Sequence, residues 1–292
     1  MCDENTVEDN KAFLRKSSQL TRRQFNTLAT GAALGMILPA TVNAQAVTES
    51  HVNVTTPDGT ADCYFVHPAT GKHAGVLIWP DILGLRPAFE MMGKRLAESG
   101  YSVLVVNPYY RSATAPVVPE GATFQDSSVR NTVFPLARQL SAETHMTDAR
   151  AFVTFIDDQA AVDTGRKIGT MGYCMGGPIT MRTAAAMPDR IGAGASFHGG
   201  GLVTKGADSP HLLVAKTNAH FLFAIAENDD QRDPEAKNVL RETYKEANLP
   251  AEIEVYKGAL HGWCPPDSSV YNEAQAERAW ERLLVLFKSA LA

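Results

Sequence analysis

The sequence predicts an α/β fold, a doubly wound and mostly parallel sheet with helices on both faces. Short apolar runs that lack clean alternation recur along the chain, as expected of strands buried on both sides. Segments with helical periodicity lie between these runs, and this alternation favours a doubly wound sheet. Polar or glycine-rich residues follow several runs, at the strand ends where such sheets bind ligands.

The predicted elements follow in a regular order. Strands are predicted at residues 75–79, 101–106, 167–171, 192–197, 221–226 and 252–256. Helices are predicted at residues 87–99, 144–159, 179–187, 234–247 and 273–291. Pro234 behind Asp233 is typical of a helix start, and Asn272 is a candidate N-cap of the last helix. Because no repeat or biased linker follows residue 47, residues 47–292 are expected to form one domain.

Length, composition and charge narrow the class of function. The 292 residues are 45% hydrophobic and 20% charged, which is typical of a globular chain with a sizeable core. The formal net charge is -5, whereas a nucleic-acid surface needs a basic face. We therefore expect a small-molecule substrate and no nucleic-acid partner.

Residues 1–46 have the parts of an export signal. The pair Arg22-Arg23 precedes Phe25, as in a twin-arginine signal. Asn26 and Thr27 depart from that pattern, which usually has an apolar and then a basic residue there. The twin-arginine export machinery is therefore an expected partner, and the alternatives are a disordered tail or a retained anchor.

The apolar part of this segment is short. Residues 28–40 form a run of about 13 residues, whereas a helix needs roughly 20 to span a bilayer. Small residues follow, and cleavage is expected after Ala44 or Ala46. The mature protein is then expected to be periplasmic or secreted, without stable membrane association.

A cysteine occupies the central position of a nucleophile-elbow pattern. Gly172-Tyr173-Cys174-Met175-Gly176 has the spacing of the G-x-S-x-G turn, with cysteine in place of serine. A strand is predicted before it and Pro178 is expected to open a helix after it. Cys174 is thus a candidate nucleophile, and the alternative is a small buried core cysteine.

A base and an acid follow in the order that such an elbow requires. His261 lies just after the strand at 252–256 and is the candidate general base. Asp229 follows the strand at 221–226 and is the candidate orienting acid, with Asp230 and Glu227 as alternatives. Acidic loops of this kind are often only solvated turns. The other seven histidines are interpreted as surface or packing residues.

An oxyanion hole is expected from two backbone N–H groups. Met175 follows the nucleophile, and Ile82 lies in the loop after the strand at 75–79. Asp81 is then expected to face Cys174, unless it only forms a turn after Pro80. The run His198-Gly199-Gly200-Gly201 resembles a lipase oxyanion motif but comes after the nucleophile, so we interpret it as a flexible loop. No metal-binding motif is present.

Together, Pro80–Gly84, Gly172–Gly177, the Asp229 loop and Leu260–Trp263 resemble the dienelactone hydrolase family of the α/β-hydrolase superfamily. The resemblance covers nearly all of residues 50–290. It implies hydrolysis of an enol-lactone through an acyl-thiol intermediate, without a cofactor. It also implies the triad Cys174, Asp229 and His261.

The resemblance bears on further residues around the site. The family has a thiol-activating glutamate where this chain has Asp81, and two arginines that hold the substrate carboxylate. Arg111 matches the first arginine, and no arginine follows His261 shortly to match the second. Tyr109 and Tyr110 are expected to shape the pocket, and residues 112–140 to form its rim or lid.

Three other functions remain open from the sequence. A general carboxylesterase has the same machinery. A thiol redox protein would pair Cys174 with Cys264, although the three cysteines after residue 46 do not suggest a disulfide framework. A binding protein on the same fold would lack turnover.

Overall fold

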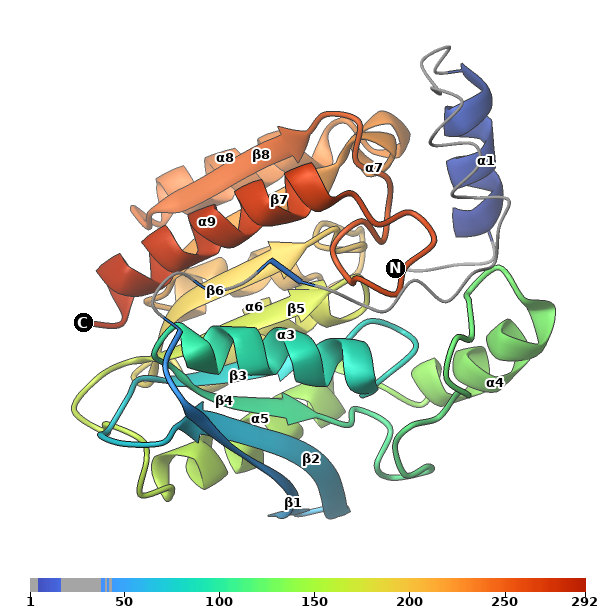
Figure 1. The fold of residues 1–292 in the computed structure, drawn as a ribbon. Coiled ribbons are helices and arrows are strands. Elements are labelled where there is room, and N and C mark those ends of the chain that lie inside the picture. Colours follow the sequence, from blue (N-terminus) through green and yellow to red (C-terminus); the bar gives the residue numbers. More distant parts are fainter. Residues whose placement is uncertain (1–4, 17–37, 40, 42–43) are drawn as a thin grey trace.

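One eight-stranded sheet organises the computed structural model, which describes residues 5–16, 38–39, 41 and 44–292 (Figure 1). Its order is β1-β2-β4-β3-β5-β6-β7-β8. The pairs β1/β2 and β2/β4 are antiparallel, and all others are parallel. The strands are β1 Val47–Thr56, β2 Gly59–Pro68, β3 Gly75–Trp79, β4 Ser102–Val106, β5 Ile168–Tyr173, β6 Ile191–Phe197, β7 His220–Ala226 and β8 Ala251–Tyr256.

Helices cover both faces of the sheet. One face carries α3 (Pro87–Glu98) and α9 (Glu273–Ala290), and the other carries α5 (Ala142–Asp157), α6 (Gly176–Ala186) and α8 (Ala236–Glu246). Shorter or peripheral elements are α1 Thr6–Lys16, α4 Ser127–Ala137, the 3-10 helix η1 Pro210–Lys216 and α7 Glu227–Arg232. The predicted doubly wound α/β architecture is confirmed.

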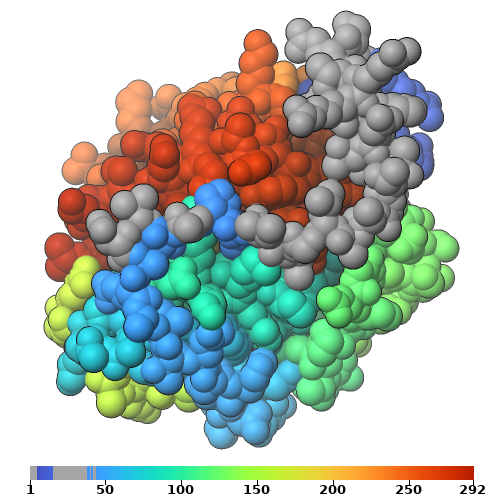
Figure 2. Space-filling model, in the orientation of Figure 1, coloured from blue at the N-terminus to red at the C-terminus, as the bar shows by residue number. Residues whose placement is uncertain are grey.

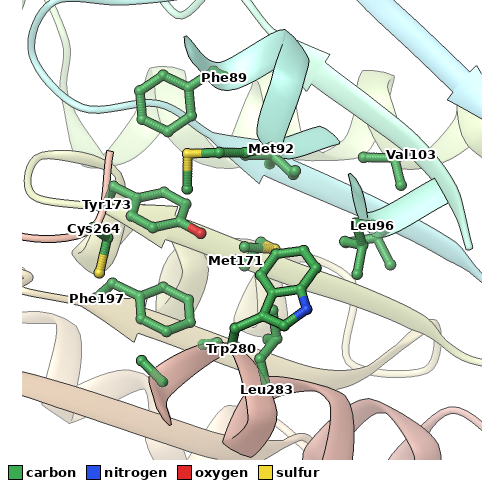
Figure 3. Close-up of a cluster of buried hydrophobic side chains, with 14 of the residues drawn as sticks. Phe89, Met92, Leu96, Val103, Met171, Tyr173, Phe197, Cys264, Trp280 and Leu283 are labelled. Atoms are coloured by element: carbon green, nitrogen blue, oxygen red, sulfur yellow. The ribbon is translucent and has the colours of Figure 1, made fainter. Parts of the chain in front are cut away.

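The central strands are apolar on both sides because each face packs against a helical layer. In β3, Val76 and Ile78 join the core under α3 and α9, whereas Leu77 and Trp79 join the core under α5 and α6. Successive strand residues point to opposite faces, so an uninterrupted apolar run fills both cores. Figure 3 shows part of the first core, in which Tyr173 and Trp280 pack with Met92.

The six predicted strands and five predicted helices are all present, with ends shifted by a few residues. The β1/β2 hairpin was not predicted, because its outer strand alternates polar and apolar residues and is largely exposed. Asn272 caps α9 as predicted, since its side chain accepts a hydrogen bond from the Gln275 N–H. The predicted start at Asp233 is wrong: its N–H bonds to the Asp229 carbonyl at the end of α7, and α8 begins at Ala236.

Residues 112–140 contribute an additional layer beside the sheet. Their helix α4 packs with the preceding loop on a third apolar cluster, which includes Cys174 and Met175. In the space-filling view this part of the chain is green and lies at the right side of the molecule (Figure 2). This segment packs beside the candidate nucleophile, and its role as a rim or lid stays a prediction.

Most of the predicted export signal lies outside the described residues, including Arg22-Arg23 and nearly all of the run 28–40. Within the described ranges, no helix is both long enough and apolar enough to span a bilayer. The helix α1 (Thr6–Lys16) precedes the arginine pair and packs on α7.

Candidate active site

Cys174 occupies a strained turn between β5 and α6. Its φ of 51° lies in the left-handed region, which a residue with a Cβ adopts only under local constraint. Gly172 and Gly176 permit this turn: a Cβ on Gly172 would lie 2.2 Å from the Gly176 carbonyl oxygen, and one on Gly176 would lie 2.3 Å from that of Trp79. The turn therefore has the geometry of a nucleophile elbow.

The backbone on both sides of Cys174 is hydrogen-bonded. Its N–H donates to the Phe197 carbonyl at 3.0 Å, and its own carbonyl accepts from the Gly177 N–H at 3.1 Å. The second bond leads directly into α6, so the side chain stands at the N-terminus of an eleven-residue helix. The positive end of the helix dipole favours the thiolate over the thiol.

His261 and Asp229 form a hydrogen-bonded pair next to Cys174. The Nδ1 atom of His261 lies 2.7 Å from Oδ2 of Asp229, and the same imidazole is hydrogen-bonded to the Cys174 side chain. Burial opposes the charged ring, but the Asp229 carboxylate and the Cys174 sulfur raise the pKa of His261 to about 10. The imidazole is thus held between an acid and a thiol, as the sequence predicts.

The two alternative acids have other partners. Glu227 accepts a hydrogen bond from the Gly258 N–H at 2.7 Å, and Asp230 pairs with Lys237 at 2.5 Å. The three carboxylates lie on the helix α7 and not in the predicted loop, and Asp229 is the one that bonds to His261.

Asn228 fixes the backbone of the histidine loop. Its Oδ1 accepts from the His261 N–H at 2.9 Å, and its Nδ2 donates to Oδ1 of Asn10 at 2.7 Å. Asn10 in turn donates to the His261 carbonyl at 3.3 Å. Sequence reasoning missed Asn228, although its place beside the acid is the signal that could have found it.

A second contact ties α1 to the same region. Asp9 of α1 pairs with Arg232 of α7 at 3.2 Å, one turn after Asp229. The helix α1 therefore contacts both the helix α7, which carries the candidate acid, and the loop that carries the candidate base.

Ile82 and Met175 lie together beside Cys174 in the third apolar cluster. Among the described residues, no hydrogen bond engages either of their N–H groups. The Tyr109 hydroxyl donates to the Ile82 carbonyl at 2.8 Å and contacts Sδ of Met175 at 3.4 Å, which joins the two loops. The role of these two N–H groups as oxyanion donors stays a prediction, and Tyr109 joins the two loops that carry them.

Asp81 is held by an arginine that the sequence analysis did not single out. Arg86 donates to both carboxylate oxygens of Asp81, at 2.8 and 3.0 Å. It also donates to both oxygens of Asp267, at 2.6 and 3.0 Å. Burial raises the pKa of Asp81, and Arg86 opposes this shift. Asp81 thus belongs to a buried ion-pair cluster, Asp81-Arg86-Asp267, and lies near enough to Cys174 for their charges to interact. It also forms the alternative turn, since its Oδ1 accepts a hydrogen bond from the Leu83 N–H at 2.9 Å.

Arg111 and Tyr110 are directed to a different part of the molecule. Arg111 donates to Asp58 in the β1/β2 turn and to Asp148 on α5, with its shortest contacts at 2.6 Å. The Tyr110 hydroxyl bonds to Asp148 and Thr56, both at 2.7 Å. The predicted substrate-binding role of these two residues therefore finds no support in their contacts. Their physical role is to join α5 to the hairpin.

His198 lies against the candidate base instead of in a flexible loop. Its ring centroid is 5.1 Å from that of His261 and 5.2 Å from that of Trp263. Burial and the neighbouring His261 lower the pKa of His198 well below its ordinary value, so the ring is neutral. Within the described part of the chain, neither ring nitrogen has a hydrogen-bond partner. The interpretation as a packing histidine fits, but that of a flexible loop is wrong at this residue.

The other cysteines belong to the cores. Cys63 and Cys264 are buried thiols outside any disulfide within the described residues. Cys264 packs beside Tyr173 and Phe197, and burial raises its pKa well above the ordinary value (Figure 3). Its protonated form is unfavourable for thiol exchange. A cluster of three metal-ligating side chains is absent from the part of the chain that the structure describes.

Several known proteins resemble this chain over most of its length. A carboxymethylenebutenolidase of Rhodococcus opacus is 26% identical over 255 residues, 84% of this chain and 94% of that protein. A solved dienelactone hydrolase-like promiscuous phosphotriesterase from metagenomic libraries matches with a TM-score of 0.70 and 19% identity, over 85% of this chain and 100% of its own. A dienelactone hydrolase of Anabaena variabilis matches with a TM-score of 0.58 and 15% identity, over 84% and 99%.

The two solved structures share the α/β-hydrolase fold of this chain. The model of the dienelactone hydrolase family matches residues 61–291, which include the elbow, the acid loop and the histidine loop. The chain therefore belongs to the dienelactone hydrolase family and is a hydrolase of that class.

Proposed function

We propose that this hydrolase cleaves a lactone or small ester through a covalent acyl-thiol intermediate on Cys174. The observation that carries the proposal is the hydrogen-bonded series Asp229, His261 and Cys174 at a strained elbow. A raised imidazole pKa and a helix N-terminus both favour a thiolate paired with an imidazolium. The resting enzyme then already carries its activated nucleophile.

The first half-reaction forms the thioester. The Cys174 sulfur attacks the carbonyl carbon, a C–S bond forms, and the carbonyl π electrons move to oxygen. The N–H groups of Ile82 and Met175 stabilise this oxyanion. When the intermediate collapses, the C–O bond breaks and the leaving oxygen takes the proton of His261.

The second half-reaction restores the enzyme. Water attacks the thioester carbon while His261 takes a proton from that water. Collapse of the second intermediate breaks the C–S bond, returns the electron pair to Cys174 and releases a carboxylic acid. Asp229 stabilises the imidazolium in both steps, since its carboxylate remains bonded to Nδ1.

The decisive experiment combines kinetics with detection of the intermediate. The full chain is assayed on a panel of lactones and aryl esters, beside Cys174→Ala and His261→Ala. We expect hydrolysis by the wild type, loss of it in both variants, and an acyl mass increment on the Cys174 peptide after rapid quenching. Cys63→Ala is the matched control. Cys63 is also a buried cysteine, but it lies in the core under α5 and α6, away from the cluster that contains Cys174, so this variant should retain activity.

Three results would contradict the proposal. Equal hydrolysis by all variants would remove Cys174 from the mechanism. Reversible formation of a Cys174-Cys264 disulfide without any hydrolysis would favour the redox alternative. Ligand binding without turnover would favour a binding protein.

We also propose that residues 1–46 direct twin-arginine export to the periplasm. The support is the arginine pair at 22–23, the short apolar run after it and the small residues at 44–46. This machinery carries folded proteins, so Cys174 would cross the membrane already buried. The test is fractionation of cells that express the wild type or a variant with both arginines changed to lysine; equal export of both would contradict the proposal.

A further inference from the structure

The cation expected to hold a substrate carboxylate is already occupied. Four hydrogen bonds join Arg111 to Asp58 and Asp148, through all three of its nitrogens. Asp148 is 1% exposed, so releasing Arg111 would leave a buried carboxylate without its cation. A substrate would have to replace this contact at a large cost.

Arg86, the buried arginine that bonds to Asp81, also has no free donor. A guanidinium has five N–H donors. In Arg86 these make five hydrogen bonds, two to each carboxylate of the cluster Asp81-Arg86-Asp267 and one to the Gly84 carbonyl at 3.2 Å. No donor remains for a third carboxylate.

The charge beside the thiol is also unfavourable for an anion. The Asp81-Arg86-Asp267 cluster holds two carboxylates against one guanidinium, whereas Asp229 pairs with both His261 and Arg232, at 2.7 and 3.8 Å. Like charges in a poorly solvated site repel strongly. An anionic acyl group would therefore meet repulsion without a compensating contact.

The side chains that pack around Cys174 are apolar and therefore favour an uncharged acyl group. The cluster around Cys174 consists of Ile82, Leu83, Tyr109, Val118, Val129, Val133 and Met175. Val129 and Val133 are four residues apart on α4 and so present one apolar face of that helix. Burying a charge against such a surface is costly, whereas an apolar chain gains by it.

We infer that the substrate is an ester or lactone with an uncharged, apolar acyl group, and that the Asp81-Arg86-Asp267 cluster excludes anionic acyl groups. The inference rests on the proposed Cys174 chemistry and names its substrate class. The product, a carboxylate, is repelled by the same charges, which favours its release.

A matched pair of substrates tests this directly with the full chain. The 4-nitrophenyl monoester of glutaric acid carries a terminal carboxylate, and its methyl ester is the uncharged counterpart with the same acyl chain. We expect kcat/KM to be about 10- to 100-fold higher for the uncharged ester, the range of one missing charge-assisted contact. Equal values, or a preference for the anion, would overturn the inference. If the protein hydrolyses neither ester, the proposed Cys174 chemistry is overturned, and this inference fails with it.

Asp267→Asn tests the role of the cluster. This variant removes one negative charge and weakens the hydrogen bonds that Arg86 donates to residue 267. The ratio of kcat/KM for the anionic ester to that for the uncharged ester should therefore rise several-fold. Glu277→Gln is the matched control, because Glu277 also makes a bidentate pair with a largely buried arginine, Arg95, at 2.6 and 2.7 Å. Its ratio should not change. An unchanged ratio in Asp267→Asn, or an equal rise in both variants, would contradict the role of the cluster.

Discussion

Two carboxylates flank the Cys174 elbow, and their partners differ in acid-base character. Asp229 bonds to the imidazole of His261 at 2.7 Å, whereas Asp81 bonds to the guanidinium of Arg86 at 2.8 and 3.0 Å. An imidazole gains and loses a proton in the accessible pH range, but a guanidinium remains protonated. The first pair is therefore suited to proton transfer, and the second to holding charge in a fixed place.

A carboxylate near a thiol can either support proton transfer by a neighbouring imidazole or take part in a fixed ion pair. Asp229 acts through His261, since it raises the pKa of the ring that contacts the sulfur. Asp81 is committed to Arg86, which also binds Asp267. The role of an acid near the candidate nucleophile is therefore decided by the acid's hydrogen-bond partner and not by its nearness to the sulfur.

The largest expected effect comes from exchanging each acid for its amide. Asp229→Asn should lower kcat by about 10²- to 10⁴-fold, because the imidazolium loses its buried counter-charge and its preferred tautomer. Asp81→Asn should lower kcat by less than about tenfold, because Arg86 keeps the charge of Asp267. Steady-state kinetics on an uncharged aryl ester, with circular dichroism as the folding control, measure both. A larger loss in Asp81→Asn would reverse the comparison.

The second prediction concerns stability. Arg86→Gln should reduce the free energy of unfolding by about 3 to 5 kcal/mol, because it leaves Asp81 buried without a cation. Adding Asp81→Asn to Arg86→Gln should restore part of the loss, since the stranded charge is removed with it. Urea denaturation of the three proteins measures this. A loss below about 1 kcal/mol in Arg86→Gln would mean that the cluster is solvated and does not hold Asp81.

The third prediction is that the stability of the fold and the rate of hydrolysis depend on pH through His261. His261 has its pKa raised to about 10 in the folded protein, and unfolding returns it to about 6.5. Its contribution to stability is therefore complete below about pH 6.5 and is lost as the pH rises through about 10. Hydrolysis should fall over the same alkaline range, because the leaving group loses its proton donor.

Denaturant unfolding and kcat/KM, both measured from pH 6 to 10.5, test this prediction. In Asp229→Asn the alkaline limb of kcat/KM should move to lower pH, because the carboxylate that raises the imidazole pKa is gone. In Asp81→Asn the limb should shift much less, since Asp81 bonds to Arg86. An alkaline limb near pH 6.5 in the wild type would contradict the raised pKa.

The smallest expected effect is at Asn228. Asn228→Ala removes the hydrogen bond to the His261 N–H and leaves that donor buried, which should cost about 1 to 3 kcal/mol of stability. Activity should fall about tenfold or less, because Asp229 still orients the ring. Asn238→Ala on α8 is the matched control, since this asparagine is exposed and bonds only within its helix. Similar effects in the two variants would deny Asn228 a positioning role.

Much of the fold and the core of the site could be predicted because their signals are local. A run such as Gly75–Trp79 reveals a strand buried on both faces, and the glycines at 172 and 176 reveal a strained turn by their spacing. The order of Cys174, Asp229 and His261 along the chain then selected the acid and the base. The hairpin β1/β2 was not predicted, because its exposed outer strand lacks a continuous apolar run.

The sequence by itself determined the order of the candidate catalytic residues along the chain, with the candidate nucleophile at the elbow, the candidate acid after β7 and the candidate base after β8. Only the tertiary structure decided which charges meet. Arg86 finds Asp267 across 181 residues, and Arg111 turns to Asp148 across 37. The physical reason is that a backbone turn is specified by neighbouring residues, whereas an arginine's partner is whichever carboxylate the folded chain brings within hydrogen-bond distance.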